Sequence, residues 1–246
     1  MIGPPVLDWL RRDPRAEPTI ELDGRTLPLQ VRRNDRARRL TMRLSADGSA
    51  VLVTIPRWTP TREALAFAAA RIDWLERQAA RIPVVAPVGP GSSFPFRGAL
   101  VSVTHDPAAT RAVRLEGDSV RLGGPAESVA ARLSRWLRAE ALARVSEDLS
   151  HYCAQAECDT PALSLSSAQR RWGSCSARGA VRINWRLIMA PDMVRRSVVA
   201  HEVAHLAHFD HSPRFKAHLS SLFEGDLAEA DRWLKREGRS LYAHFG

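Results

Sequence analysis

A pair of histidines four residues apart, His201 and His205, is the feature that most constrains this chain of 246 residues. Apolar residues flank them at helical spacing, which predicts a helix with one buried face. Residues at this spacing lie on one face of a helix, so both imidazoles can point at one ion. Zinc accepts imidazole nitrogen, and a catalytic zinc site leaves one position for water. Glu202 directly follows the first histidine and can therefore act as general base toward that zinc-bound water.

A third ligand is expected where this helix ends. His211 follows His205 closely, and Asp210 together with Ser212-Pro213 marks a chain break between two helices. Serine is a good N-cap and proline a good first helical residue, so a new helix is expected to begin there. The chain can turn at the break and return the His211 imidazole to the ion, and we favour His211 as the third ligand.

His208 is a weaker candidate for the same role. It lies seven residues after His201, which is roughly 10 Å along a helix axis, so an unbroken helix cannot bring both rings to one ion. We expect its ring to support a ligand or to lie in solvent. Three later residues remain alternatives for the third ligand: His218, Glu224 and Asp226.

The whole chain predicts an α+β fold in three parts. Residues 1–18 are rich in proline and arginine and are expected to be a disordered tail. Residues 19–124 are expected to be a β-rich region with one helix, and residues 125–246 a hydrolase domain. No internal repeat is found in the sequence.

Within the β-rich region, alternating apolar patterns predict strands between 20 and 55 and a second strand group between 93 and 122. Turn signals occur at Asp47-Gly48 and at Gly117-Asp118. The one helix is expected between the two groups, ending at about Arg81. The hydrolase domain is expected to contain these elements in order: a long amphipathic helix over 128–157, strands over 162–167 and 180–187, the metal helix, and helices over 212–223 and 225–237.

The charge balance has two interpretations. The formal net charge is +9, and of the 36 lysines and arginines only Lys216 and Lys235 are lysines. A basic surface for nucleic acid, nucleotides or another polyanion is one interpretation. The other is the compositional bias of a GC-rich genome, which we favour because the arginines are spread along the chain.

The cysteines and apolar runs indicate the compartment. The three cysteines form no CxxC pair, so a disulfide framework is not expected. We therefore expect the protein in a reducing compartment, the cytoplasm. No stretch approaches the roughly 18 apolar residues of a membrane span, so no membrane association is expected.

Two stretches carry a resemblance to a known family. They are 171–188, which contains Arg-Trp-Gly-Ser-Cys-Ser and Ile-Asn-Trp-Arg-Leu-Ile, and 201–215, which contains the HExxH motif. Over about residues 30–240 the chain resembles the YgjP-like predicted metal-dependent hydrolases, relatives of the SprT-like and WLM metallopeptidases in the zincin group. The resemblance implies a zincin-like core of a long helix, a small sheet, the HExxH helix and C-terminal helices. It also implies zinc on three histidines, with Glu202 as base: His201, His205 and His211.

The sequence departs from the family pattern at two positions. Asp210 stands where asparagine is usual, and Lys216 where tryptophan is usual, and both changes bear on the pocket wall. The histidine spacing also equals that of the metzincins. In those proteins a glycine stands at the position of His208, so we interpret that likeness as convergence.

The Arg-Trp-Gly-Ser-Cys stretch offers further candidates. Its strand region is expected to line the cleft, where an extended peptide can add to a strand edge. Arg171 and Asn184 are candidates for binding substrate or stabilising an oxyanion. Cys175 is interpreted as a small buried residue, because no basic partner for a nucleophile is evident.

Three functions are compatible with these residues. The favoured one is a zinc-dependent metallopeptidase acting on a peptide or protein. The alternative is a metal-dependent hydrolase of nucleotide phosphoanhydrides, of the pyrophosphatase type. A basic module with structural zinc is the third, and Glu202 argues against it because a structural site needs no base. The arginines that can hold phosphates in the alternative are Arg170, Arg171, Arg182, Arg186, Arg195 and Arg196.

Overall fold

The computed structural model describes residues 18–45, 47–80 and 87–245. Contacts divide the chain into two compact units, with the division between Val84 and Val85. The boundary predicted from the sequence lies later, after residue 124. The structure groups the second strand group with the helical part because these strands share one hydrophobic core with it. Apart from Pro18, the tail predicted for residues 1–18 lies outside the described residues.

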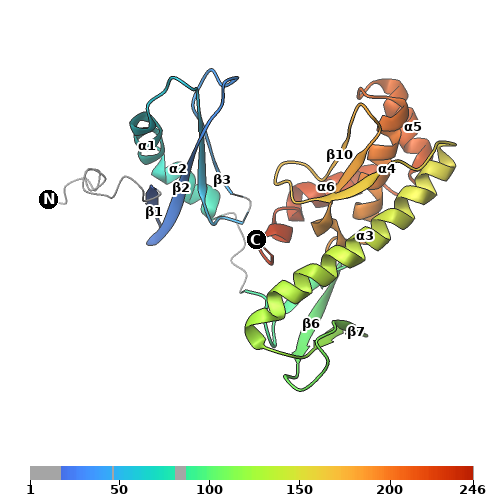
Figure 1. The fold of residues 1–246 in the computed structure, drawn as a ribbon. Helices are drawn as coiled ribbons and strands as arrows, with labels where there is room; N and C mark the ends of the chain where they lie inside the picture. The colour runs from blue at the N-terminus through green and yellow to red at the C-terminus, as the bar shows by residue number, and fades with distance from the viewer. Residues whose placement is uncertain (1–17, 46, 81–86, 246) are drawn as a thin grey trace. The chain divides into compact units, whose positions relative to one another are not determined.

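The first unit is a four-stranded sheet with two short helices (Figure 1). The strand order is β1-β2-β4-β3, with antiparallel outer pairs and a parallel central pair. Gly24 and Gly48 adopt positive φ angles in the two hairpin turns, a conformation that glycine adopts without strain. The elements are β1 (Thr19–Leu22), β2 (Arg25–Arg33), β3 (Thr41–Leu44), β4 (Val51–Ile55), α1 (Thr61–Ala69) and α2 (Ile72–Ala79).

The single helix predicted for this unit is divided in two. Arg71 leaves the helical region with φ −131° and ψ 26°, and its N–H donates to the Ala68 carbonyl in a tighter turn. The break lets the two helices pack on different strands, α1 on β4 and α2 on β1 and β3. A twisted sheet explains this difference, because one straight helix cannot follow its surface.

The second unit begins with a sheet that repeats the strand order of the first. Its order is β5-β6-β8-β7, again with antiparallel outer pairs around a parallel pair. The same topology therefore occurs twice without a sequence repeat. The strands are β5 (Ser93–Phe96), β6 (Ala99–His105), β7 (Arg114–Glu116) and β8 (Ser119–Leu122).

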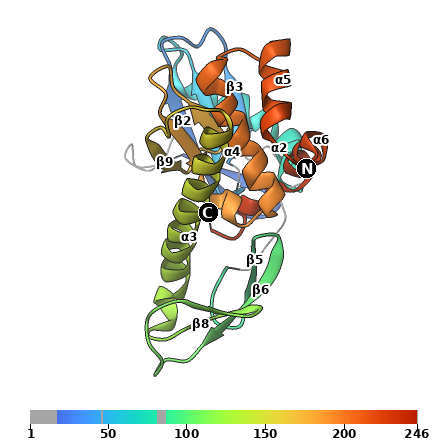
Figure 2. The same ribbon diagram turned by 90° about the vertical axis from the view of Figure 1, so that its right-hand side faces the viewer.

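The rest of the second unit is built around one long helix, α3 (Val129–Gln155). Figure 2 shows the sheet containing β5, β6 and β8 beside one end of α3, and α4 and α5 toward its other end. A small sheet with the order β10-β11-β9 completes the unit. The remaining elements are η2 (Ala126–Ser128), β9 (Leu163–Ser166), β10 (Gly173–Cys175), β11 (Val181–Asn184), η3 (Trp185–Ile188), α4 (Asp192–Ala207), α5 (Pro213–Leu222), α6 (Leu227–Glu237) and η4 (Ser240–Tyr242).

Two local expectations differ from these elements. Between the strands expected over 162–167 and 180–187 lies a further strand, β10, which pairs antiparallel with β11. The strand expected over 180–187 ends at Asn184, where its side chain accepts a hydrogen bond from the Arg186 N–H and starts the 3₁₀ turn η3. The α+β class is confirmed.

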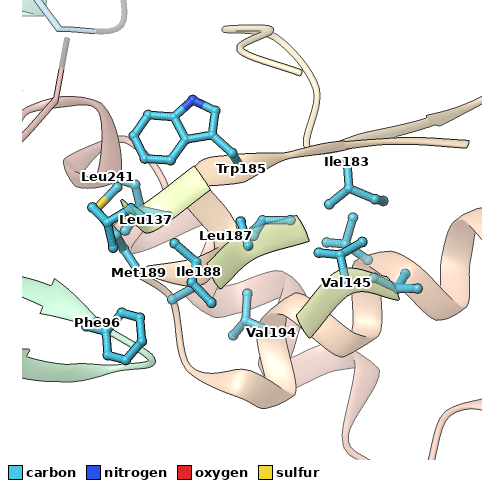
Figure 3. Close-up of a cluster of buried hydrophobic side chains, with 14 of the residues drawn as sticks. Phe96, Leu137, Val145, Ile183, Trp185, Leu187, Ile188, Met189, Val194 and Leu241 are labelled. Carbon is cyan, nitrogen blue, oxygen red and sulfur yellow. The ribbon is translucent and has the colours of Figure 1, made fainter. Parts of the chain in front are cut away.

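The core of the second unit lies where α3, η3 and α4 meet (Figure 3). Leu137 and Val145 of α3, Leu187 and Ile188 of η3, and Val194 of α4 point into it and are almost fully buried. This apolar contact stabilises α4 against α3 and η3, because burying a side chain of this size contributes about 1.5–3 kcal/mol. Among the helices of the described ranges, none has the length and apolar character that crossing a membrane requires.

A buried ion pair fixes α4 against α3. The guanidinium of Arg195, 4% exposed, donates through Nε to Asp148 Oδ2 at 2.7 Å. Arg195 also contacts Asp192, which in turn pairs with Arg97 at 2.5 Å. Each of these four charged side chains has an oppositely charged partner, so the pair of Arg195 and Asp148 can stay buried.

We expect Asp148→Asn to destabilise the second unit by roughly 3–5 kcal/mol, because it removes the more deeply buried of the two carboxylates that pair with Arg195. Urea unfolding followed by circular dichroism measures the change. Asp231→Asn is the matched control, since it breaks the exposed pair with Lys235 and should change stability little. Equal losses in both variants would contradict the role assigned to the buried pair.

Candidate metal centre

Three imidazoles converge on one point beside α4. The Nε2 atom of His201 lies 3.1 Å from that of His205 and 3.4 Å from that of His211. Tetrahedral zinc with bonds of about 2.0–2.1 Å separates its nitrogen ligands by about 3.3–3.4 Å. One ligand atom from each of these residues lies within 4.8 Å of the others, and in the described part of the chain this is the one such group of three. The donor set therefore fits a tetrahedral metal ion with one position left over.

The chain break returns His211 as the sequence suggests it can. His208 leaves the helical conformation with φ −135° and ψ 107° and ends α4. The Asp210 carboxylate accepts from the Ser212 N–H at 3.3 Å, and the Ser212 hydroxyl accepts from the Phe215 N–H at the start of α5. These local bonds set the turn that brings the His211 ring over the other two.

The main chain at His208, rather than its ring, contacts the site. Its carbonyl oxygen lies 2.9 Å from Nδ1 of His205 and accepts the proton there. That bond leaves Nε2 of His205 unprotonated and aimed at the ion, the usual arrangement for a ligating histidine. The His208 ring lies against His218, with the ring centroids 5.6 Å apart.

Phe215 forms the apolar floor of the site. It is 2% exposed and packs against all three imidazoles, with centroid distances of 5.0, 4.5 and 4.9 Å to His201, His205 and His211. Packing of this kind limits the rotamers of the three rings. It also excludes water from one side of the site, which strengthens its electrostatic interactions.

The ionisation of His201 suits a metal ligand. Burial lowers its pKa to about 4, and the neighbouring His205 and His211 add to the effect. The ring is therefore neutral near pH 7 and presents a lone pair. A metal ion binds histidine in this form.

Glu202 lies beside this cluster without belonging to it. Its side chain is 5% exposed, and its carboxylate is directed at β10, where the Cys175 backbone N–H donates to it. Burial raises the pKa of Glu202 to about 7, while that N–H and the charge of Arg171 oppose the rise. A carboxyl with a pKa near the working pH is suited to accept and return a proton.

Gly173 makes room for this carboxylate. A Cβ atom at position 173 would lie 2.3 Å from Glu202 Oε1 and 2.8 Å from Cδ. Any side chain there would displace Glu202. The glycine of the Trp-Gly-Ser motif is therefore required by the position of Glu202, a long-range contact that the sequence analysis missed.

The structure separates the two residues assigned to substrate binding. Arg171 is exposed, and its charge acts on Glu202. Asn184 is fully buried, and its amide donates to Ala168 O and Tyr242 Oη. Its amide group is thus committed to holding the C-terminal segment, so the environment does not support a substrate-binding role for Asn184.

Cys175 contributes its backbone rather than its thiol. Burial and the Glu202 carboxylate raise the pKa of this thiol. The thiolate is disfavoured, and the side chain packs against the core but is only partly buried, whereas the sequence predicts a buried residue.

The alternative third ligands have other partners. The Glu224 carboxylate accepts from Tyr152 Oη at 2.9 Å and pairs with Arg196. Asp226 caps α6 by accepting from the N–H groups of Ala228 and Glu229. His218 faces His208, as described above.

Three of the six arginines named for phosphate binding are used inside the fold. Arg195 pairs with Asp148, and Arg196 pairs with Glu224. Arg186 is 4% exposed and lies over the rings of Trp185 and Tyr242. The other three are exposed: Arg170, Arg171 and Arg182.

Comparison with known proteins gives one finding. A family model described as YgjP-like, metallopeptidase domain, matches residues 38–237, which is most of the chain and includes the whole histidine cluster. Searches of curated proteins and of solved structures give no significant match. The match supports a metal-dependent hydrolase or peptidase, and with it a metal cofactor.

We expect His211→Ala to weaken metal binding by more than about 100-fold, beyond the effect typical of residues that only support a ligand. His208→Ala should change it less than about threefold, because its backbone carbonyl still accepts from His205. Retention of added Zn²⁺ against a series of chelators ranks the variants. Equal losses would mean that His211 is not the third ligand.

Proposed function

The chain belongs to the YgjP-like family, and from this we propose that it is a zinc-dependent metallopeptidase in which Glu202 is the general base. One observation carries the proposal. A buried carboxylate with a raised pKa lies next to three convergent imidazoles and is held outside their cluster by β10. A structural metal site has no use for such a group, whereas hydrolysis does.

Zinc is the metal that the donor set favours. Three imidazole nitrogens at near-tetrahedral separations suit Zn²⁺, and no carboxylate or thiolate joins them as expected for harder or softer ions. When bound, the ion would supply Lewis-acid polarisation of the scissile carbonyl and of the attacking water. His201, His205 and His211 would hold it.

The chain's own residues move the proton. Glu202 accepts a proton from the attacking water at one carboxylate oxygen, while the Cys175 N–H keeps the carboxylate in place. The same carboxyl then returns the proton to the departing amine nitrogen, because its raised pKa leaves both protonation states accessible. Arg171 acts on Glu202 from the exposed side and favours the ionised form.

A peptide substrate fits the strand next to Glu202. β10 is an edge strand of its sheet, and an extended peptide can add to such an edge through main-chain hydrogen bonds. Since β10 also positions Glu202, a chain bound along it would pass close to the base. This arrangement favours peptide bonds over the alternative substrate, nucleotide phosphoanhydrides.

The alternative retains one specific observation in its favour. Arg170, Arg171 and Arg182 are exposed on or next to the small sheet. Arginines in that position can hold phosphates. The alternative is weakened because the other three arginines named for it are committed to internal contacts.

We expect Glu202→Gln to keep fold and bound zinc while lowering hydrolysis by about 10²–10⁴-fold, the typical worth of general-base catalysis. Unfolded protein and nucleoside triphosphates are assayed in parallel, each with and without DNA, and zinc content is measured on the same samples. Loss confined to the protein substrate supports the peptidase. Activity within about threefold of the wild type would refute a base role for Glu202.

We expect Gly173→Ala to lower activity by about tenfold or more without loss of metal, because the added methyl group displaces the Glu202 carboxylate. Ser174→Ala on the same strand is the control and should stay near wild type. In the Glu202→Gln background, Gly173→Ala should lower activity little further, since both substitutions act through the Glu202 carboxylate. Additive losses would show that Gly173 acts elsewhere.

A further inference from the structure

One end of the first unit's sheet carries a dense group of arginines. β2 and β4 are parallel, so the connections that follow Arg33 and Ile55 leave from the same end of the sheet. The acidic residues in these two segments are Asp35 and Glu63. We call the following residues the arginine end: Arg32, Arg33, Arg36, Arg38, Arg39, Arg57 and Arg62.

These charges are exposed and not neutralised. Every arginine of the group is exposed, and none of them takes part in a salt bridge between described residues. Like charges at this density repel one another and give a strongly positive local potential. The arginines of the second unit at Arg195 and Arg196 contrast with them, since each has a carboxylate partner.

An exposed aromatic ring lies among these arginines. Trp58 is 71% exposed and directly follows Arg57. Arg33 holds the loop on both sides of the tryptophan, donating to the carbonyl oxygens of Arg57 at 3.0 Å and Thr59 at 2.6 Å. The loop is therefore pinned to the sheet while the ring it carries remains in solvent.

The sheet face next to the arginine end is polar. The helices pack on the face that buries Val51, Val53 and Ile55. Strand alternation places Arg32, Thr54 and Thr41 side by side on the opposite face, as the register pairs Arg32 with Thr54 and Thr54 with Thr41. A polar surface, with Arg32 as its charged member, thus continues from the loops onto three adjacent strands.

We propose that the arginine end binds single-stranded nucleic acid, with its arginines on phosphates and Trp58 stacked on a base. Unpaired bases expose faces for an aromatic ring, whereas a duplex hides them in its own stack. Arginine suits phosphate because its fork makes two parallel hydrogen bonds. A lipid surface would require further apolar side chains around Trp58, and its neighbours in the arginine end are charged. The inference is independent of the hydrolytic activity proposed above.

Fluorescence anisotropy with the full-length chain tests this surface. The probes are oligomers of thymidine or uridine, about 16 nucleotides long, a DNA hairpin duplex, and vesicles containing phosphatidylserine. Binding to either oligomer supports the proposal, and the pair distinguishes DNA from RNA. Preference for the duplex or for vesicles over both oligomers overturns it. Circular dichroism confirms that each variant is folded.

Three variants separate the phosphate contacts from stacking. Replacing three arginines by glutamine should lower the slope of log K against log salt by about 2, since each phosphate contact on a single strand contributes about 0.7. Trp58→Ala should weaken binding by about tenfold at unchanged slope, and Trp58→Phe should retain most of the affinity. The triple substitution is Arg36→Gln, Arg38→Gln and Arg39→Gln.

A charge-matched control removes three exposed arginines of the second unit: Arg111→Gln, Arg114→Gln and Arg135→Gln. This variant has the same net charge as the triple substitution and should keep the wild-type affinity and salt slope. Equal weakening by the two triple variants would show that binding follows net charge alone. That result, or an affinity indifferent to Trp58→Ala, overturns the assigned site.

Discussion

The packing of α4 between the core and β10 is the constraint on which the rest of the site depends. One side of this helix is fully buried at Val199, Ala200 and Val203, while the other has to present two imidazoles and a carboxylate. Burying a carboxylate is costly without a donor, and the Cys175 N–H supplies one. An edge strand can give that N–H because it has no neighbour on its outer side. The metal ligands, the base and the small sheet are therefore parts of one arrangement.

Sequence reasoning succeeded where the relevant geometry is local. The helical repeat alone relates His201 to His205, and the Ser212-Pro213 helix start alone indicates that the chain turns before α5. It failed at β10, because three residues between turns carry no periodic signal and become a strand only by pairing with β11. Asn184 illustrates the same limit. An asparagine in a sequence shows no sign of whether its amide will be buried and fully bonded.

The division of the chain shows how local signals mislead about cores. Gly123-Gly124-Pro125 interrupts the pattern as a boundary would, yet the strands before it and the helix after it bury their apolar side chains together. Phe94 and Val120 are fully buried in that shared core with Leu133 of α3. A glycine–proline stretch marks a change of chain direction, whereas a domain is defined by a hydrophobic core that its segments share. The shared core decides which segments fold as one unit.

The two sheets have the same strand order but different roles in the protein. The sheet of β5 to β8 contributes its apolar residues to the core around α3, so its function is support for the metal domain. The sheet of β1 to β4 closes a core of its own with α1 and α2, and its polar face and one end are free to carry charge.

The net charge of +9 is spread evenly when counted along the sequence. In three dimensions it is uneven, because Arg186, Arg195 and Arg196 of the second unit are engaged in ion pairs and ring contacts, while those of the arginine end are exposed and form no salt bridge between described residues. A composition bias explains why arginine is used so often, but it does not explain why the seven arginines of the arginine end form no salt bridge between described residues.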